Sequence, residues 1–97
     1  MSADAAAVEV REDPEGSRYE AVVGGRVAGF AAYRMRGGHV VFTHTEVDPQ
    51  FEGQGVGSSL ARGALDDVRR KGLGVIAMCP FIAAFIRRHP EYADLTT

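Results

Sequence analysis

The chain has 97 residues, of which 45% are hydrophobic and 25% charged, and a formal net charge of -2 at pH 7. A chain of this length can bury one core, so we expect a single domain spanning residues 1–97. The weak negative charge argues against nucleic-acid binding, which depends on neutralising phosphates. The single cysteine, Cys79, excludes an internal disulfide and fits a reducing compartment.

The apolar runs and the first residues of the sequence indicate the cellular compartment to expect. No apolar run approaches the roughly 20 residues that a membrane helix requires. The first ten residues, MSADAAAVEV, carry no basic residue ahead of their apolar residues, whereas a secretory signal would. We therefore expect a cytoplasmic protein.

The first half of the chain predicts an antiparallel meander of four strands. Gly24-Gly25 and Gly37-Gly38 each separate two apolar runs, a pattern typical of tight hairpins because both positions tolerate positive φ. Asp48-Pro49 ends the last strand, since proline cannot donate a hydrogen bond into a sheet. The four predicted strands cover residues 8–13, 19–23, 26–35 and 39–47.

The second half predicts a helix, a strand, a second helix and a tail, which makes the fold class α+β. Apolar residues recur on one face of the first helix, and Lys71-Gly72 supplies a basic last turn and a glycine cap. The strand is continuously apolar, so we expect both of its faces to be buried. These elements cover residues 60–71, 73–78, 81–89 and 91–97.

Three glycines at alternate positions, Gly53, Gly55 and Gly57, precede the first helix. Glycines let the backbone turn its N–H groups inward, and a helix N-terminus adds unpaired N–H groups and a partial positive charge. The pattern therefore predicts a phosphate site, although the glycines could also serve only a tight strand-to-helix turn. The loop lacks the lysine of a Walker loop, and Ser58 breaks the spacing of a dinucleotide fingerprint.

The segment VDPQFEGQGVGSSL resembles the acyl-CoA-binding segment of the GNAT N-acetyltransferases. That family carries a Gln/Arg-x-x-Gly-x-Gly/Ala pattern between its fourth strand and the following helix. The later segment MCPFIAAFIRRHPEY is similar to a subgroup of small GNAT-like proteins, which have a Cys-Pro after the fifth strand and a His-Pro-Glu-Tyr ending. The resemblance implies a fifth strand that runs parallel to the fourth and splays away from it.

The resemblance also implies acetyl-CoA as cosubstrate, an amine as acceptor and no metal. The pyrophosphate would lie on the backbone N–H groups of residues 54–58, and the pantetheine arm would pair with the backbone near Glu46 and Val47. Arg87 and Arg88 point about 100° apart on a helix, so only one can easily face the ligand. The expected cofactor-binding residues are Val47, Gly53, Gln54, Gly55, Val56, Gly57, Ser58, Pro80, Phe81, Arg87 and Arg88.

The sequence departs from the family pattern in three respects. Glu52 occupies the first motif position, where a carboxylate would repel a pyrophosphate unless its side chain faces solvent. Many GNAT enzymes protonate the departing thiolate with a tyrosine of the last helix, but the matching residue here is Phe85, which has no hydroxyl. The chain is also too short for the two helices that shape the acceptor pocket in larger members.

The candidate catalytic residues are Cys79, His44 and Glu46. Cys79 follows the predicted buried strand and is either a proton relay, a transient acyl carrier or a small buried hydrophobic side chain. Strand alternation places His44 and Glu46 on the same face as Phe42. If that face looks towards the acceptor, the pair can accept a proton and recognise the amine; if it looks towards the helices, His44 is structural.

Three further polar aromatic residues have weaker claims. Tyr92 could supply a phenol near the thiol, His39 is expected to be exposed after its turn, and His89 is expected to pack or cap near Pro90. The sequence thus favours an acetyl-CoA-dependent N-acetyltransferase. The alternatives are a non-enzymatic acyl-CoA-binding module and a small interaction domain whose glycine loop is only structural. The acceptor and the oligomeric state stay open.

Overall fold

A computed structural model describes residues 7–97, so the expectation about the first ten residues lies largely outside the described part. Two 3₁₀ segments, η1 and η2, accompany the strands and helices. The elements in chain order are β1 (Glu9–Asp13), β2 (Arg18–Val23), β3 (Arg26–Arg36), β4 (His39–Val47), η1 (Pro49–Phe51), α1 (Val56–Arg70), β5 (Gly74–Ala77), α2 (Pro80–Arg88) and η2 (Pro90–Thr96).

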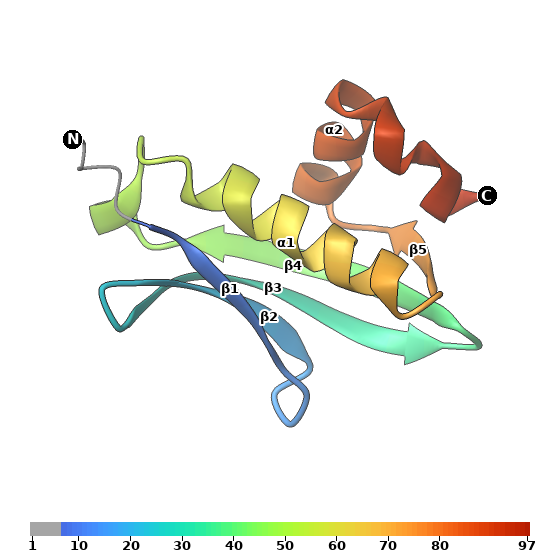
Figure 1. Cartoon of the computed structure of the whole chain (residues 1–97), viewed down its shortest axis with the longest axis horizontal. Helices are drawn as coiled ribbons and strands as arrows, with labels where there is room; N and C mark the ends of the chain where they lie inside the picture. The colour runs from blue at the N-terminus through green and yellow to red at the C-terminus, as the bar shows by residue number, and fades with distance from the viewer. Residues whose placement is uncertain (1–6) are drawn as a thin grey trace.

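The five strands form one sheet in the order β1-β2-β3-β4-β5, antiparallel from β1 to β4 and parallel between β4 and β5 (Figure 1). The two Gly-Gly turns have the expected geometry: φ is +57° and +80° at Gly24 and Gly25, and +50° and +82° at Gly37 and Gly38. The α+β class, the meander and the parallel fifth strand are therefore confirmed.

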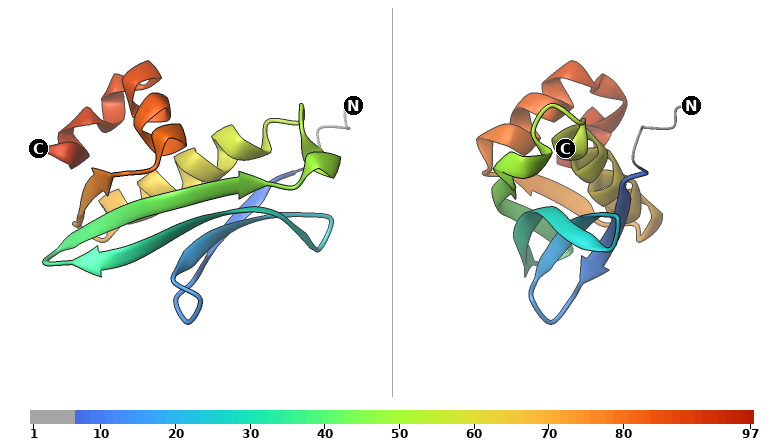
Figure 2. Two further views of the ribbon diagram at one scale, coloured as in Figure 1. Left: turned by 180° about the vertical axis from the view of Figure 1, so that it is seen from behind. Right: turned by 90° about the vertical axis from the view of Figure 1, so that its left-hand side faces the viewer.

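Both helices and η2 lie on the same side of the sheet, and α1 runs along it (Figure 2). The apolar stripe of α1 is fully buried and belongs to the same core as Tyr19, Ala31 and Phe42 of the sheet. That stripe consists of Leu60, Ala61, Ala64, Leu65 and Val68. The opposite face of the sheet carries no helix among residues 7–97, so we call it the open face.

Within the described residues, no helix has the length and apolar character needed to cross a membrane.

Two expectations for the C-terminal part are wrong. The fifth strand is not buried on both faces: Val75 is buried, but Ile76 is 36% and Met78 62% exposed. Side chains alternate along the strand, so these two residues lie on the open face, where no helix among residues 7–97 covers them. Residues 91–97 are not a loose tail either. They form most of η2, which buries Tyr92 and Leu95 in the core.

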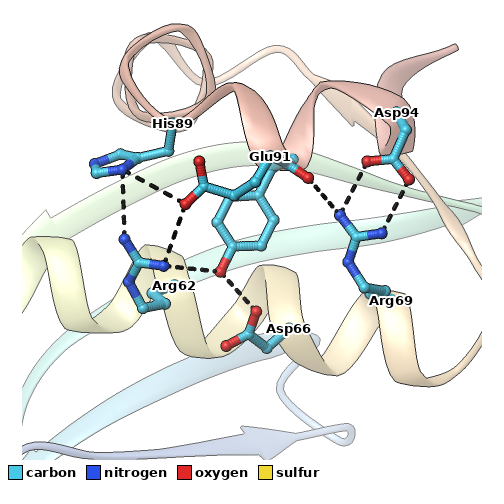
Figure 3. A network of polar contacts seen from close by, with 7 residues as sticks. Arg62, Asp66, Arg69, His89, Glu91 and Asp94 are labelled. Carbon is cyan, nitrogen blue, oxygen red and sulfur yellow. Dashed lines mark hydrogen bonds and ion pairs between the residues drawn. The ribbon is translucent and has the colours of Figure 1, made fainter.

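Polar contacts hold η2 against α1 (Figure 3). The Tyr92 hydroxyl donates to Asp66 over 2.6 Å and accepts from Arg62 over 3.2 Å. Arg69 donates to both carboxylate oxygens of Asp94, each over 2.9 Å. The His-Pro-Glu-Tyr ending therefore fastens the C-terminal segment over the core.

A buried carboxylate, Glu20, lies on the open face of β2. It is 5% exposed and accepts hydrogen bonds from Arg18 over 2.7 Å and from Arg11 over 3.2 Å. The Arg18 hydrogen bond is the main cause that lowers the pKa of Glu20 below its ordinary value of 4.5, although burial opposes the shift. The ionised form of Glu20 is thus favoured in the folded protein.

This lowered pKa predicts a loss of stability in acid. The contribution of Glu20 should be complete above pH 4.5 and should disappear as the pH falls through the folded-state pKa. Glu20→Gln should lower the free energy of unfolding at pH 7 by about 1 kcal/mol, because both arginine partners are partly exposed. Urea denaturation from pH 7 to pH 3 should show a smaller pH dependence for this variant. An unchanged dependence would contradict the assignment.

Candidate functional site

The three glycines before α1 serve two different purposes. Gly53 and Gly55 have φ of +82° and +76°, and Gly55 is the N-cap residue of the helix. Gly57 has ordinary backbone angles, but a Cβ atom there would lie 2.8 Å from Cζ of Phe81. Two glycines therefore direct the backbone, while the third lets α2 approach α1 closely.

The N-terminus of α1 is available to an anion. Its first backbone bond runs from the Ser59 N–H to the Gly55 carbonyl, and the N–H groups of residues 56–58 make no hydrogen bond within the described part of the chain. No side chain caps the helix and its first turn contains no acidic residue. These N–H groups can therefore bind a phosphate.

A cavity of about 260 Å³ lies over this helix end. The glycine loop forms one side, and Val47 of β4 and Phe81 of α2 contribute apolar surface. Glu52 is exposed, as expected, yet it also lines this cavity, so its carboxylate reduces the attraction for an anion. The predicted loop residues other than Gln54 thus line one cavity together with Phe81.

Beyond Phe42, β4 and β5 diverge. Their pairing ends at Phe42 and Ala77, whereas β4 continues to Val47. The N–H group of Asp48 donates to Ala28 of β3, so alternation directs the backbone groups of Thr45 and Val47 towards the side that β5 has left. A ligand amide can pair with β4 at this opening.

Cys79 lies where the two strands separate. It is buried, and its Sγ atom is 3.2 Å from Oγ1 of Thr45 on β4. Its backbone N–H donates to the carbonyl of Phe42, the last residue of β4 that pairs with β5. The thiol and the Thr45 hydroxyl are therefore in contact at the apex of the opening, and either atom can be the donor.

The prediction that His44 and Glu46 share a face with Phe42 is wrong. Ala32 pairs with His44, but the next residue, Tyr33, pairs with Phe42, so Thr43 is an extra residue in β4. Such a bulge reverses the alternation of side chains. Phe42 points into the core, while His44 and Glu46 lie exposed on the open face.

His44 and Glu46 interact directly, with 2.9 Å between Nε2 and Oε2. An ionised carboxylate can only accept, so the imidazole donates through Nε2 and keeps Nδ1 as a free acceptor. The alternative of a core histidine does not apply, since the pair is exposed on the side opposite to the helices. The pair can accept a proton on that side.

The remaining predicted site residues lie on α2. Pro80 is its first residue, and Arg87 and Arg88 are exposed in its last turn. Phe85 belongs to the buried core, where its ring centroid lies 4.2 Å from that of His89. His89 thus packs at the end of α2 as expected.

The guess that Tyr92 acts near the thiol receives no support. Its hydroxyl is bonded to Asp66 and Arg62 of α1. Burial, with the Asp66 hydrogen bond, also raises the pKa of Tyr92, which makes the phenol a weaker acid. Thr45 is the residue that the sequence reasoning missed, because its contact with Cys79 depends on the spacing of two distant segments.

The fold and this site together define a class: small proteins of the GNAT architecture, with a splayed β4–β5 pair and a glycine-rich loop before α1. The chain belongs to the GCN5-related N-acetyl-transferase family, whose profile matches residues 18–95. A comparison with curated proteins gave no match.

A solved structure supports the same fold. The chain is similar to a Staphylococcus aureus protein assigned as GCN5-like N-acetyltransferase, whose solution structure was determined by NMR. The two share 22% identity with a TM-score of 0.69, over 92% of this chain and 87% of the other. At this identity the likeness concerns the fold alone.

Proposed function

We propose that this protein binds acetyl-CoA in the opening between β4 and β5 and transfers its acetyl group to an amine. The observation that carries the proposal is that two chemical features border this opening. The free N–H groups at the start of α1 border one end, and the contact between Cys79 and Thr45 borders the other. Family membership supports the same reading.

The N–H groups of residues 54–58 would hold the pyrophosphate, with Gly53 and Gly55 giving the loop its curvature. The backbone of Thr45 and Val47 would pair with the amides of the pantetheine arm. Phe81, which lines the cavity and contacts Gly57, would flank the arm. Pro80 starts the helix that brings Phe81 there.

In the proposed reaction, the amine nitrogen attacks the thioester carbonyl and the carbon–sulfur bond breaks. Nδ1 of His44 takes the proton that the amine loses, while Glu46 holds the ring through Nε2. The departing thiolate takes a proton from Cys79, which Thr45 orients. Proton removal and proton delivery thus occur from opposite faces of β4, so Phe85 need not carry a hydroxyl.

The proposal is tested by incubating the protein with acetyl-CoA and a panel of amines. Release of free CoA together with an acetylated amine, detected by mass spectrometry, is expected. His44→Ala should lower kcat by about 10² to 10⁴ while leaving the KM for acetyl-CoA nearly unchanged, because its role is proton transfer. His39→Ala, at the start of the same strand, is the matched control. Equal activity of both variants would contradict the role of His44.

One of the two neighbouring arginines should contribute to acetyl-CoA binding. Arg87→Ala and Arg88→Ala should differ, since their side chains leave α2 in directions about 100° apart. The sensitive variant should bind more weakly by about 3- to 10-fold at low salt and less so at high salt, as a screened phosphate contact requires. Calorimetric titration at two salt concentrations measures this. Equal, negligible effects would show that neither arginine contacts the ligand.

A non-enzymatic acyl-CoA-binding module is the second candidate. The burial of Phe85 where the family often has a tyrosine favours it. Tight binding of acetyl-CoA without transfer to any amine of the panel would support this candidate over the enzyme.

A further inference from the structure

A second cavity, of about 300 Å³, lies beside the C-terminal end of β4. Val27 and Phe30 of β3 line it together with Glu46 and Asp48. Val47 lines both this cavity and the one over the glycine loop, so the end of β4 separates the two. We call the second cavity the β3–β4 pocket.

We propose that the β3–β4 pocket selects the acceptor: a small monoamine with an apolar, preferably aromatic, body. Its nitrogen would lie at Glu46 and His44, and its body against Val27 and Phe30. This inference rests on the proposed acetyl transfer and names the substrate class for it.

The location of Glu46 connects the pocket to the reaction. Glu46 lines the pocket and its Oε2 atom contacts Nε2 of His44. The Oε1 atom has no protein partner among residues 7–97, so it can accept a hydrogen bond from an ammonium group. His44 directly precedes Thr45, the residue in contact with Cys79. An amine bound at Glu46 would therefore lie one residue along β4 from Thr45, on the open face of the strand.

The body of the acceptor would meet apolar surface. Val27 is 41% exposed, although it is a large aliphatic residue, and Phe30 is partly exposed beside it. The Phe30 ring has its centroid 6.0 Å from that of His44, and the Arg18 guanidinium lies 4.9 Å from it. These contacts orient the ring, which offers surface for an aromatic or aliphatic group. A volume near 300 Å³ suits a small molecule.

The charges around the pocket favour a single positive charge over several. Asp48 is partly engaged, because Oδ1 accepts the N–H group of Gln50. Two arginines lie nearby: Arg18 over Phe30, and Arg26, which donates to Gln50 over 3.4 Å. A polyamine would bring additional cations close to these guanidinium groups, where like charges repel.

The test compares 2-phenylethylamine with spermidine as acceptors of the full chain. The value of kcat/KM should be at least about tenfold higher for 2-phenylethylamine. In a separate experiment without turnover, 2-phenylethylamine added to the protein with CoA should shift the NMR signals of the Val27–Phe30 amides. Phe30→Ala should raise the KM for 2-phenylethylamine about tenfold with unchanged CoA affinity. Met35→Ala, which truncates an exposed apolar residue elsewhere on β3, is the matched control.

The outcomes separate this inference from the proposed transfer. Transfer to spermidine or to a lysine peptide, with no NMR shift of the Val27–Phe30 amides on adding 2-phenylethylamine, would overturn this inference but support the proposed acetyl transfer. Binding of 2-phenylethylamine in the β3–β4 pocket without any acetyl transfer would overturn the proposed transfer but support the pocket as an amine-binding site. If the amide signals do not move and no amine is acetylated, both are wrong. Equal effects of Phe30→Ala and Met35→Ala also contradict the pocket.

Discussion

Gly55→Glu should weaken acetyl-CoA binding by about a hundredfold or more while the protein stays folded. A glutamate at the N-cap of α1 would put a side chain and a negative charge beside the N–H groups proposed to hold the pyrophosphate. Charge-assisted hydrogen bonds contribute roughly 1.5–3 kcal/mol each, so loss of two is sufficient. The cost to folding is smaller, about 1–2 kcal/mol for a side chain at positive φ, because no atom lies within 4 Å of the added Cβ. Calorimetric titration measures the affinity, and circular dichroism checks the fold.

Two variants serve as controls for Gly55→Glu. Gly37→Glu adds the same side chain at φ of +50°, also with no neighbour within 4 Å, and should leave the affinity unchanged. Glu52→Gln removes a negative charge from the same cavity and should tighten binding several-fold, roughly 1 kcal/mol or less for an exposed charge. Normal affinity in a folded Gly55→Glu protein would refute the loop assignment.

Cys79→Ser should keep the affinity for CoA and lower kcat by about 10² or more. In the proposed mechanism the thiol protonates the departing thiolate, and a serine hydroxyl is a far weaker acid than a thiol. Thr45→Val should also lower kcat, because it removes the hydroxyl that contacts Sγ over 3.2 Å. Thr43→Val, at the exposed bulge residue, is the matched control. Steady-state kinetics with the best amine of the panel measures all three.

A second measurement distinguishes the roles of the thiol. Mass spectrometry after incubation with acetyl-CoA should detect no lasting acetyl group on Cys79 if the residue relays a proton. A labile adduct would instead make it an acyl carrier. Full activity of Cys79→Ser would remove Cys79 from the reaction and leave His44 with Glu46.

Much of the fold follows from local chemistry that a sequence displays. The Gly-Gly pairs require positive φ, so they mark both hairpins, and the apolar stripe of α1 marks its buried face. The burial of β5 and of η2 cannot be predicted in this way, because it depends on neighbours far along the chain. An apolar strand at a sheet edge can keep one face exposed, as Ile76 does. A polar tail can be fastened by helix residues, as Tyr92 is by Asp66.

The candidate site likewise has some features that the local sequence predicts and others that it does not. The glycine loop was recognisable because its spacing is local, and Cys79 because it directly precedes Pro80. The bulge at Thr43 has no local signature, yet it decides which side of the sheet His44 faces. The pairing of Thr45 with Cys79 joins residues 34 positions apart, so only the three-dimensional arrangement reveals it.

The most direct test of the central claim is a crystal structure of the protein with acetyl-CoA. We expect the pyrophosphate within hydrogen-bonding distance of the N–H groups of residues 56–58 and the pantetheine arm along Thr45 and Val47. The thioester should then lie beside Sγ of Cys79. A ligand bound elsewhere with the opening between β4 and β5 empty, or no bound ligand at millimolar acetyl-CoA, would contradict the claim.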